Sequence, residues 1–240
     1  MIIPLSGDFS ENRVKFRPTP KDPKFELPKA YSDETRYTSD MPNLLGIFGG
    51  TFDPPHLGHL ILAAEARQQL NLTRLLWVLT PDPPHKPAAP ILPLAHRLAM
   101  LQLAISGDAD FELSHIEMDR HGPHYALDTL NLLAGQNPGA EMVYLIGGDS
   151  LRDLPTWHRP ADLLSACRYL GVMRRPGDSV DLPALEAILP GITSKVRFME
   201  APPLGISSRQ IRQRIAAGRP FRYYLPSSVY EYILEHNLYH

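Results

Sequence analysis

Short apolar runs alternate with longer stretches of helical pattern from Asn43 to the end of the chain. The short runs are rich in leucine and β-branched residues, and most are bounded by glycine, proline or aspartate, which is typical of buried strands. They predict strands over Leu44–Phe48, Leu75–Thr80, Phe111–Ile116, Met142–Ile146, Tyr169–Met173 and Val196–Met199.

Helices are predicted between and after these strands. The helical pattern covers His59–Leu70, Leu94–Ser106, Tyr125–Ala134, Ala161–Ser165, Leu182–Leu189, Ser208–Ala217 and Ser228–His236. Because strand and helix alternate through most of the chain, the sequence predicts an α/β fold in which a parallel sheet carries helices on both faces. Ligands of such sheets bind beyond the carboxyl ends of the strands, so chemically unusual residues are expected directly after strands.

Composition narrows the class of protein. The chain has 240 residues, with 24 basic and 26 acidic side chains and a formal net charge of −2. This near balance excludes a strongly basic nucleic-acid coat, so we expect no nucleic-acid partner. No stretch approaches the roughly 18 consecutive apolar residues of a membrane-spanning helix, and the N-terminus lacks the features of a secretion signal. We therefore expect no membrane partner either.

The chain contains a single cysteine, Cys167, which cannot form a disulfide within the chain or a thiolate metal cluster. This cysteine usage best fits a protein of the reducing cytoplasm. Because Cys167 precedes the apolar run RYLGVM, a buried apolar role is favoured over that of a nucleophile.

Residues 1–42 differ in composition from the rest of the chain. Six of the 25 prolines precede Asn43, in a segment with seven basic and seven acidic residues and no sustained hydrophobic period. This pattern predicts a flexible, proline-rich N-terminal arm over residues 1–42 and a folded domain over residues 43–240. Whether the arm is an unselected extension or binds a partner stays open.

The segment GIFGGTFDPPHLGH, residues 46–59, directly follows the first predicted strand. Gly49 and Gly50 allow the backbone to turn sharply and present N–H groups to a ligand that approaches closely. His56 and His59 lie on one face of the first turn of a helix, and Gly58 between them is expected to leave room for a ligand. Backbone donors, a helix N-terminus and two imidazoles together indicate a polyphosphate site.

Two other interpretations of these residues stay open at this point. One is a plain turn followed by two surface histidines, and the other is a histidine metal site, although no third ligand lies at a recognisable spacing. The dinucleotide pattern GxGxxG and the phosphate-loop pattern are both absent. Neither a Rossmann dehydrogenase nor an ordinary ATPase is therefore supported.

The segment GGTFDPPHLGH resembles the signature of the nucleotidyltransferases that carry an HxGH motif on a Rossmann-like, doubly wound parallel sheet. Its TFDPxH form is similar to that of the nicotinate-nucleotide adenylyltransferase family. The resemblance implies that His56 and His59 are catalytic and contact the phosphates of ATP. It also implies that the nucleotide is lined by Gly49, Gly50, Thr51 and Phe52.

A segment near the C-terminus, GISSRQIRQRI, is similar to the second signature of this family, ISSTxIR. The resemblance implies that Ser207 and Ser208, at a helix N-terminus, and Arg212 hold the β- and γ-phosphates. Arg209 stands where the pattern usually has threonine. The backbone donors of the helix N-terminus do not depend on that difference.

Further segments resemble parts of the family that concern the acceptor. TPDPPHKP implies that His85 and Lys86 lie near the pyridine nucleotide, and HYALDTL implies the same of Tyr125 and Ala126. In HYALDTL, His124 and Ala126 replace the family's usual serine and threonine, so the preference for acid over amide acceptors stays open.

Two last segments complete the resemblance, which covers about Leu44 to Tyr239. GGDSLRDLPTW implies that Asp149 binds the nucleotide and that Trp157 stacks on the pyridine ring. VMRRPG, which follows a predicted strand, implies a phosphate contact for Arg175 beside Arg174.

The implied reaction is the transfer of AMP from ATP to nicotinate mononucleotide, which gives deamido-NAD and pyrophosphate. Mg²⁺ is expected to bind through the substrate phosphates, with ATP itself a substrate. The alternatives are a different acceptor, such as nicotinamide mononucleotide or phosphopantetheine, a nucleotide-binding regulator without turnover, and a histidine-metal hydrolase. The sequence gives no indication of the oligomeric state.

Overall fold

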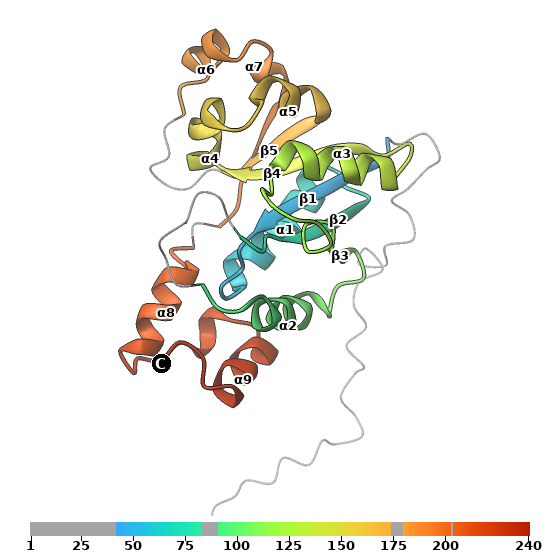
Figure 1. Cartoon of the computed structure of the whole chain (residues 1–240). Coiled ribbons are helices and arrows are strands. Elements are labelled where there is room, and N and C mark those ends of the chain that lie inside the picture. Colours follow the sequence, from blue (N-terminus) through green and yellow to red (C-terminus); the bar gives the residue numbers. More distant parts are fainter. Residues whose placement is uncertain (1–41, 83–90, 174–179, 203) are drawn as a thin grey trace, which may run out of the picture. The chain divides into compact units, whose positions relative to one another are not determined.

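The chain is organised around one parallel sheet, which the computed structural model places at the centre of the described residues, 42–82, 91–173, 180–202 and 204–240 (Figure 1). Its strand order is β3-β2-β1-β4-β5-β6. The strands are β1 (Leu44–Gly50), β2 (Arg74–Leu79), β3 (Phe111–Ser114), β4 (Glu141–Gly147), β5 (Tyr169–Met173) and β6 (Val196–Met199). The predicted doubly wound parallel sheet is confirmed.

The order of the strands places a crevice at the centre of the sheet. The chain runs outward from β1 through β2 to β3, then crosses back to β4 and continues through β5 to β6. The loops that leave the carboxyl ends of β1 and β4 therefore diverge. Ligands bind at this kind of topological switch point in open α/β sheets.

Alternating residues of each central strand belong to two different cores, as the period of two in a strand requires. In β1, Leu45 and Ile47 face one core, and Leu44 and Phe48 face the other. Because both faces are covered, the strands read as continuous apolar runs rather than as an alternating pattern.

One face of the sheet is covered by α1 (Leu57–Gln69) and α2 (Leu94–Ile105). The other face is covered by α3 (Ala126–Gln136), α4 (Gly148–Asp153), α5 (Pro160–Ala166), α6 (Leu182–Ile188) and α7 (Ile192–Lys195). Figure 1 shows α3 and α5 on the side of the sheet opposite α2.

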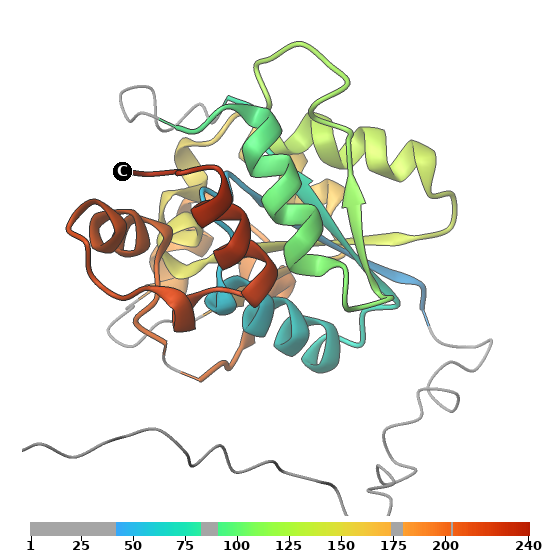
Figure 2. The same cartoon turned by 90° about the horizontal axis from the view of Figure 1, so that it is seen from below.

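The C-terminal helices form a separate layer on α2. They are α8 (Ser208–Ala216), the 3₁₀ turn η4 (Arg222–Tyr224) and α9 (Ser227–Glu235). Figure 2 shows α2 and α9 side by side. A third apolar cluster joins them, formed by Met100, Ile211, Ile215, Phe221, Leu225, Val229, Ile233 and Leu238. This layer positions α8 at the carboxyl edge of the sheet.

The structure differs from the sequence prediction in a few elements. The strand predicted to reach Ile116 ends at Ser114, because the chain turns there to begin the crossover to β4. The first helix begins at Leu57 rather than His59, and α4, α7 and the 3₁₀ turn η3 (Leu154–Thr156) were not predicted. These missed elements are too short, at six, four and three residues, to carry a readable helical period.

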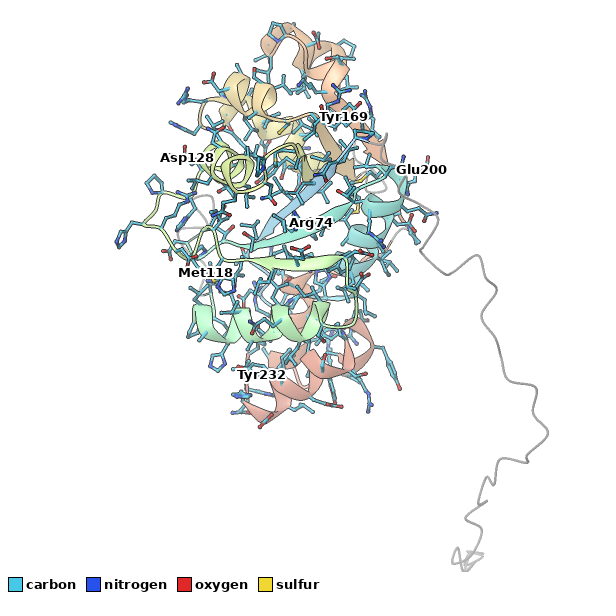
Figure 3. All side chains as sticks on the ribbon, turned by 90° about the vertical axis from the view of Figure 1, so that its right-hand side faces the viewer. Arg74, Met118, Asp128, Tyr169, Glu200 and Tyr232 are labelled. Atoms are coloured by element: carbon cyan, nitrogen blue, oxygen red, sulfur yellow. The ribbon has the colours of Figure 1, made fainter. Side chains whose placement is uncertain are left out.

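Arg74 of β2, labelled in Figure 3, lies next to the edge strand β3. The Arg74 guanidinium donates to both carboxylate oxygens of Glu112 in β3, at 3.2 and 3.1 Å, and to the side-chain oxygen of Asn137 at 2.7 Å. These bonds tie the edge strand to its neighbour. No helix of the described residues is long and apolar enough to cross a membrane.

The described residues form one folded unit, Pro42–His240. Its start lies one residue before the predicted domain boundary at residue 43. The predicted arm falls almost wholly on residues 1–41, which lie outside the described residues, so the arm stays a prediction.

Candidate active site

The loop after β1 is shaped by its own aromatic residue. Gly50 closes β1, and its carbonyl accepts a hydrogen bond from the Thr80 N–H at 3.0 Å. Phe52 adopts a left-handed backbone, with φ of 47°, and its ring is buried. A Cβ at Gly50 would lie 2.8 Å from that ring, so Gly50 must be glycine to admit Phe52. Because the Phe52 ring is packed inside, only its main chain and ring edge are left for a nucleotide.

The two histidines of the HxGH motif stack on each other at the start of α1. Their ring centroids are 3.7 Å apart, with 20° between the ring planes. His59 Nδ1 accepts a hydrogen bond from the main-chain N–H of His56 at 3.2 Å. In a neutral imidazole that accepts at Nδ1 the proton is on Nε2. The proton of His59 is therefore on Nε2.

Gly58 has a different role from the one its sequence suggested. A Cβ at this position would lie 3.1 Å from two atoms of the His56 ring. The space that the missing side chain leaves is therefore occupied by His56 itself, whose side chain is buried, and not by a ligand. The expectation of room for a ligand at Gly58 is wrong, because the helix cap folds the first histidine back over the glycine.

The N-terminus of α8 packs against the loop after β1, although the two segments are far apart in sequence. Arg212 Nη1 donates to the carbonyl oxygen of Asp53 at 2.7 Å, and Ser208 Oγ donates to the carbonyl of Pro54 at 2.8 Å. Ser207 caps α8 by accepting from the N–H of Gln210 at 3.3 Å. The structure thus brings the two predicted signatures together at one place.

The last residues of the chain hold the same loop from another direction. Tyr239 Oη donates to Asp53 Oδ1 at 2.7 Å, and the Arg212 guanidinium lies 3.9 Å from the same carboxylate. Burial and the charge of Asp53 raise the pKa of Tyr239 above its ordinary value, so its hydroxyl stays protonated and keeps donating. Sequence reasoning missed Tyr239 because it carries no local motif.

A buried arginine of α2, Arg97, fixes the loops after β1 and β2 to each other. Its guanidinium donates to the carbonyl oxygens of Thr51 at 3.1 Å, Thr80 at 2.8 Å and Pro81 at 2.7 Å, and to that of Leu92 at 3.0 Å. Because these acceptors are main-chain carbonyls, Arg97 fixes the path of the backbone in the two loops rather than the orientation of a side chain.

Sequence reasoning also missed Arg97, although the pattern of residues in α2 carries a signal for it. It lies on the buried face of α2 with Met100, Leu101 and Ile105, where a charged residue interrupts the apolar stripe. Burial lowers the pKa of its guanidinium, and the charge of Asp53 is the largest opposing influence. A lone arginine in an apolar stripe indicates buried acceptors nearby, since buried charges are otherwise unfavourable.

The carboxyl end of β4 supplies the second wall of the crevice. Asp149 lies in the first turn of α4, and its Oδ1 accepts from the Ser150 N–H at 3.0 Å. A Cβ at Gly147 would lie 2.6 Å from that oxygen, so the glycine makes room for the carboxylate. Asp149 is exposed, as a residue that meets a soluble ligand must be.

Aromatic rings from two segments meet on this side. Tyr125, the residue that precedes α3, stacks on His158 with ring centroids 4.1 Å apart. Trp157 meets Tyr144 of β4 edge to face, at 6.3 Å. Ala126 begins α3 beside Tyr125. The predicted acceptor residues Tyr125, Ala126 and Trp157 thus lie on neighbouring elements, and His158 and Tyr144 join them without having been predicted.

Buried polar groups hold the start of α3 in place behind these rings. Thr129 Oγ1 donates to Glu117 Oε1 at 2.6 Å and accepts from Arg120 Nη2 at 3.1 Å. Arg120 also donates to the carbonyl of Pro123 at 3.0 Å, just before Tyr125. The chain that leads into α3 is therefore fixed at several points.

Some predicted site residues lie outside the described residues. They are His85, Lys86 and Arg175, together with Arg174. Within the described ranges, no group of three or more His, Cys, Asp or Glu side chains is arranged to hold a metal ion. Cys167 is buried as predicted, at the end of α5, and burial raises the pKa of its thiol to about 12.

A model of the cytidylyltransferase-like family matches residues 47–214. A protein of Thermomicrobium roseum, named as a probable nicotinate-nucleotide adenylyltransferase, is 48% identical over 195 residues, which are 81% of this chain and 91% of that protein. A Roseiflexus sp. protein of the same name is 46% identical over 196 residues, covering 81% of this chain and 97% of its own. This chain belongs to the nicotinate-nucleotide adenylyltransferase family.

Solved structures confirm the fold expected for this family. The Plasmodium falciparum nicotinic acid mononucleotide adenylyltransferase complexed with APC is similar with a TM-score of 0.67, over 82% of this chain and 97% of that chain, at 19% identity. The same enzyme complexed with NaAD gives a TM-score of 0.66 at 20% identity, over the same shares of the two chains. At this identity the likeness shows the Rossmann-like fold alone.

Proposed function

We propose that this enzyme transfers AMP from ATP to nicotinate mononucleotide, forming deamido-NAD and releasing pyrophosphate. The observation that carries the proposal is the meeting of the stacked pair His56 and His59 with the N-terminus of α8 at the carboxyl end of β1. Membership of a family whose relatives carry this activity in their names supports the same reaction.

The reaction needs no nucleophilic side chain, because the acceptor phosphate itself attacks the α-phosphorus of ATP in line. The protein has to align two polyanions and stabilise the charge that develops on the transferring and leaving oxygens. His59 would donate from Nε2 to the triphosphate, and His56 would support it from the stacked position. Gly49, Gly50 and Thr51 would line the nucleotide with backbone groups, together with the main chain of Phe52.

The leaving pyrophosphate would lie at the N-terminus of α8. Ser207 and Ser208 begin this helix, whose backbone N–H groups and dipole favour an anion. One N–H of Arg212 is bonded to the carbonyl of Asp53, and the guanidinium has further donors for the phosphate oxygens. Asp149, on the opposite wall, would bind the sugar or base of the nucleotide.

The acceptor would lie on the β4 side of the crevice. Trp157 would stack on the pyridine ring, and Tyr125 and Ala126 would present the N-terminus of α3 to it. From the family resemblance alone, we assign phosphate contacts to Lys86 and Arg175 and a place near the pyridine nucleotide to His85.

We also propose that Mg²⁺ enters with the triphosphate. The buried carboxylate of Asp53 is engaged by Tyr239 and faces Arg212, so it is not a ready metal ligand. A magnesium ion that keeps mostly water and phosphate ligands fits this donor set. When bound, it would neutralise charge on the phosphate oxygens.

The test is to supply the full-length enzyme with ATP, Mg²⁺ and one pyridine mononucleotide at a time, and to quantify dinucleotide and pyrophosphate. We expect deamido-NAD with the acid mononucleotide at a higher kcat/KM than the amide gives. ATP binding without pyrophosphate release from either mononucleotide would instead identify a nucleotide-binding regulator. Activity that survives removal of ATP but is abolished by a zinc chelator would identify a metal hydrolase.

A further inference from the structure

The hydroxyl of Tyr144 lies beside the carboxyl end of β1. Tyr144 is in β4, paired in register with Ile47 of the neighbouring strand β1, and its ring faces the core covered by α3 and α5. Its Oη lies 3.4 Å from where a Cβ would stand at Gly49. The phenol therefore reaches from the middle of β4 to the turn at the end of β1.

Several residues of the predicted acceptor side pack against the same core as the Tyr144 ring. Like Tyr144, three residues pack against this core while remaining partly exposed: Ile116, Ala126 and Trp157. They come from the segment after β3, the start of α3 and the segment after β4. The Tyr144 and Trp157 rings are nearly perpendicular, at 85°. A flat ring stacked on Trp157 would therefore meet Tyr144 at an edge, where substituents project.

The Tyr144 hydroxyl forms no hydrogen bond with any of the described residues. Because Tyr144 is partly exposed, this hydroxyl is accessible to water or to a ligand. Burial, then the charge of Glu117 and then Cys167 raise the pKa of Tyr144 above its ordinary value. The phenol therefore stays protonated and is a hydrogen-bond donor throughout the working pH range.

Glu117 is the acidic group that acts on this phenol. It is tied to the Thr129 hydroxyl, and Arg120 donates to the same hydroxyl, so a guanidinium lies close to the carboxylate and offsets its charge. The remaining neighbours of Tyr144 named above are apolar or aromatic. Tyr144 thus offers a hydroxyl donor to a substituent of a flat ring.

We propose that Tyr144 Oη donates a hydrogen bond to the carboxylate on the pyridine ring of the acceptor and favours the acid over the amide. This proposal rests on the function proposed above and names a specificity-determining residue within that site. A donor bonded to a charged carboxylate gains more than the same donor bonded to a neutral amide oxygen. A single neutral hydroxyl can therefore discriminate between two ligands of nearly equal shape.

The test is the substitution Tyr144→Phe, which removes one oxygen and keeps the ring. We expect KM for nicotinate mononucleotide to rise at least tenfold, KM for ATP to stay within twofold, and kcat at saturation to change little. The ratio of kcat/KM for acid over amide should fall by a similar factor. If the amide is not turned over, its inhibition constant against the acid replaces its KM.

Tyr169→Phe is the matched control, because Tyr169 is the first residue of the neighbouring strand β5 and packs on the opposite core. It should leave both acceptors unaffected. Thermal melting supplies an independent readout, since loss of a hydroxyl with no protein partner should not lower the Tm of Tyr144→Phe.

Three results would overturn the proposal: an unchanged KM for the acid, an equal loss for acid and amide, or a marked fall in Tm that reveals a protein partner. Failure of the wild-type enzyme to make any dinucleotide would instead refute the proposed function, so the two failures are distinguishable.

Discussion

The two sides of the crevice are built by different physical means. On the β1 side, charged and polar side chains hold main-chain carbonyls: Arg97 and Arg212 donate to carbonyl oxygens of the loop, and Tyr239 holds the carboxylate of Asp53. These bonds join segments up to 186 residues apart in sequence. The loop that carries the histidines is therefore fixed before any ligand binds.

On the β4 side, the residues predicted to meet the acceptor contact each other through rings, and the polar bonds of Thr129 lie behind them. Tyr125 stacks on His158, and Trp157 meets Tyr144 at an edge. Ring contacts are less directional than hydrogen bonds to a charged group. The difference indicates that the β1 side is preorganised to stabilise charge on a triphosphate, whereas the β4 side selects a flat ligand by shape and by its edge.

The largest effect should follow from removing a donor on the β1 side. His59→Ala is expected to lower kcat by about 10²–10³, because one preorganised donor to the developing charge is lost. The Tm should fall moderately, since the ring caps the N–H of His56 and also packs against neighbouring aromatic rings. Steady-state kinetics and thermal melting check both parts. The exposed His115 gives a matched control, and near-normal turnover in His59→Ala would refute the assignment.

Arg97→Met tests whether the β1 side is held by its buried arginine. Because the substitution removes the side-chain donor of several main-chain carbonyls, we expect the free energy of unfolding to fall by about 3 kcal/mol. KM for ATP should also rise, since Thr51 belongs to the loop that is released. Urea unfolding measures the first effect. The control is Arg219→Met, at an exposed arginine, which should change neither quantity. If Arg97→Met lost no more stability than this control, the role assigned to Arg97 would be wrong.

Trp157→Ala tests the β4 side. Loss of a stacking surface is expected to weaken a flat ligand by about 1–1.5 kcal/mol, which corresponds to roughly a tenfold rise in KM for nicotinate mononucleotide. KM for ATP should stay nearly constant if the two walls bind different substrates. Initial rates at varied concentrations of each substrate separate the two. Equal losses for both substrates would contradict the stacking role.

Tyr239→Phe should have the smallest effect. It removes one hydrogen bond to a buried carboxylate that still faces Arg212, so we expect about 1–2 kcal/mol of lost stability and a rise of a few-fold at most in KM for ATP. Denaturant unfolding and ATP titration measure these quantities. A loss as large as that of Arg97→Met would show that the C-terminal contact, rather than the arginine, fixes the loop.

Much of the fold was predictable, because the strands are short apolar runs whose period is visible in a local window. All six predicted strands are present, and their ends differ from the prediction by a few residues at most. The two motifs around His56 and Arg212 could also be recognised from the amino-acid sequence alone. Short elements such as α4 and α7 were not, since a single turn of helix carries no period.

What the sequence by itself determined is therefore the set of elements, the family and the residue types of the site. Only the tertiary structure decided that Arg97 and Tyr239 hold the first loop, that Gly58 makes room for His56, and that the Tyr144 hydroxyl lies beside Gly49. Most of these contacts join distant segments, and those of Arg97 end on main-chain carbonyls. Every residue has a main-chain carbonyl, so the residue types in the sequence do not identify the carbonyl that a side chain will bind.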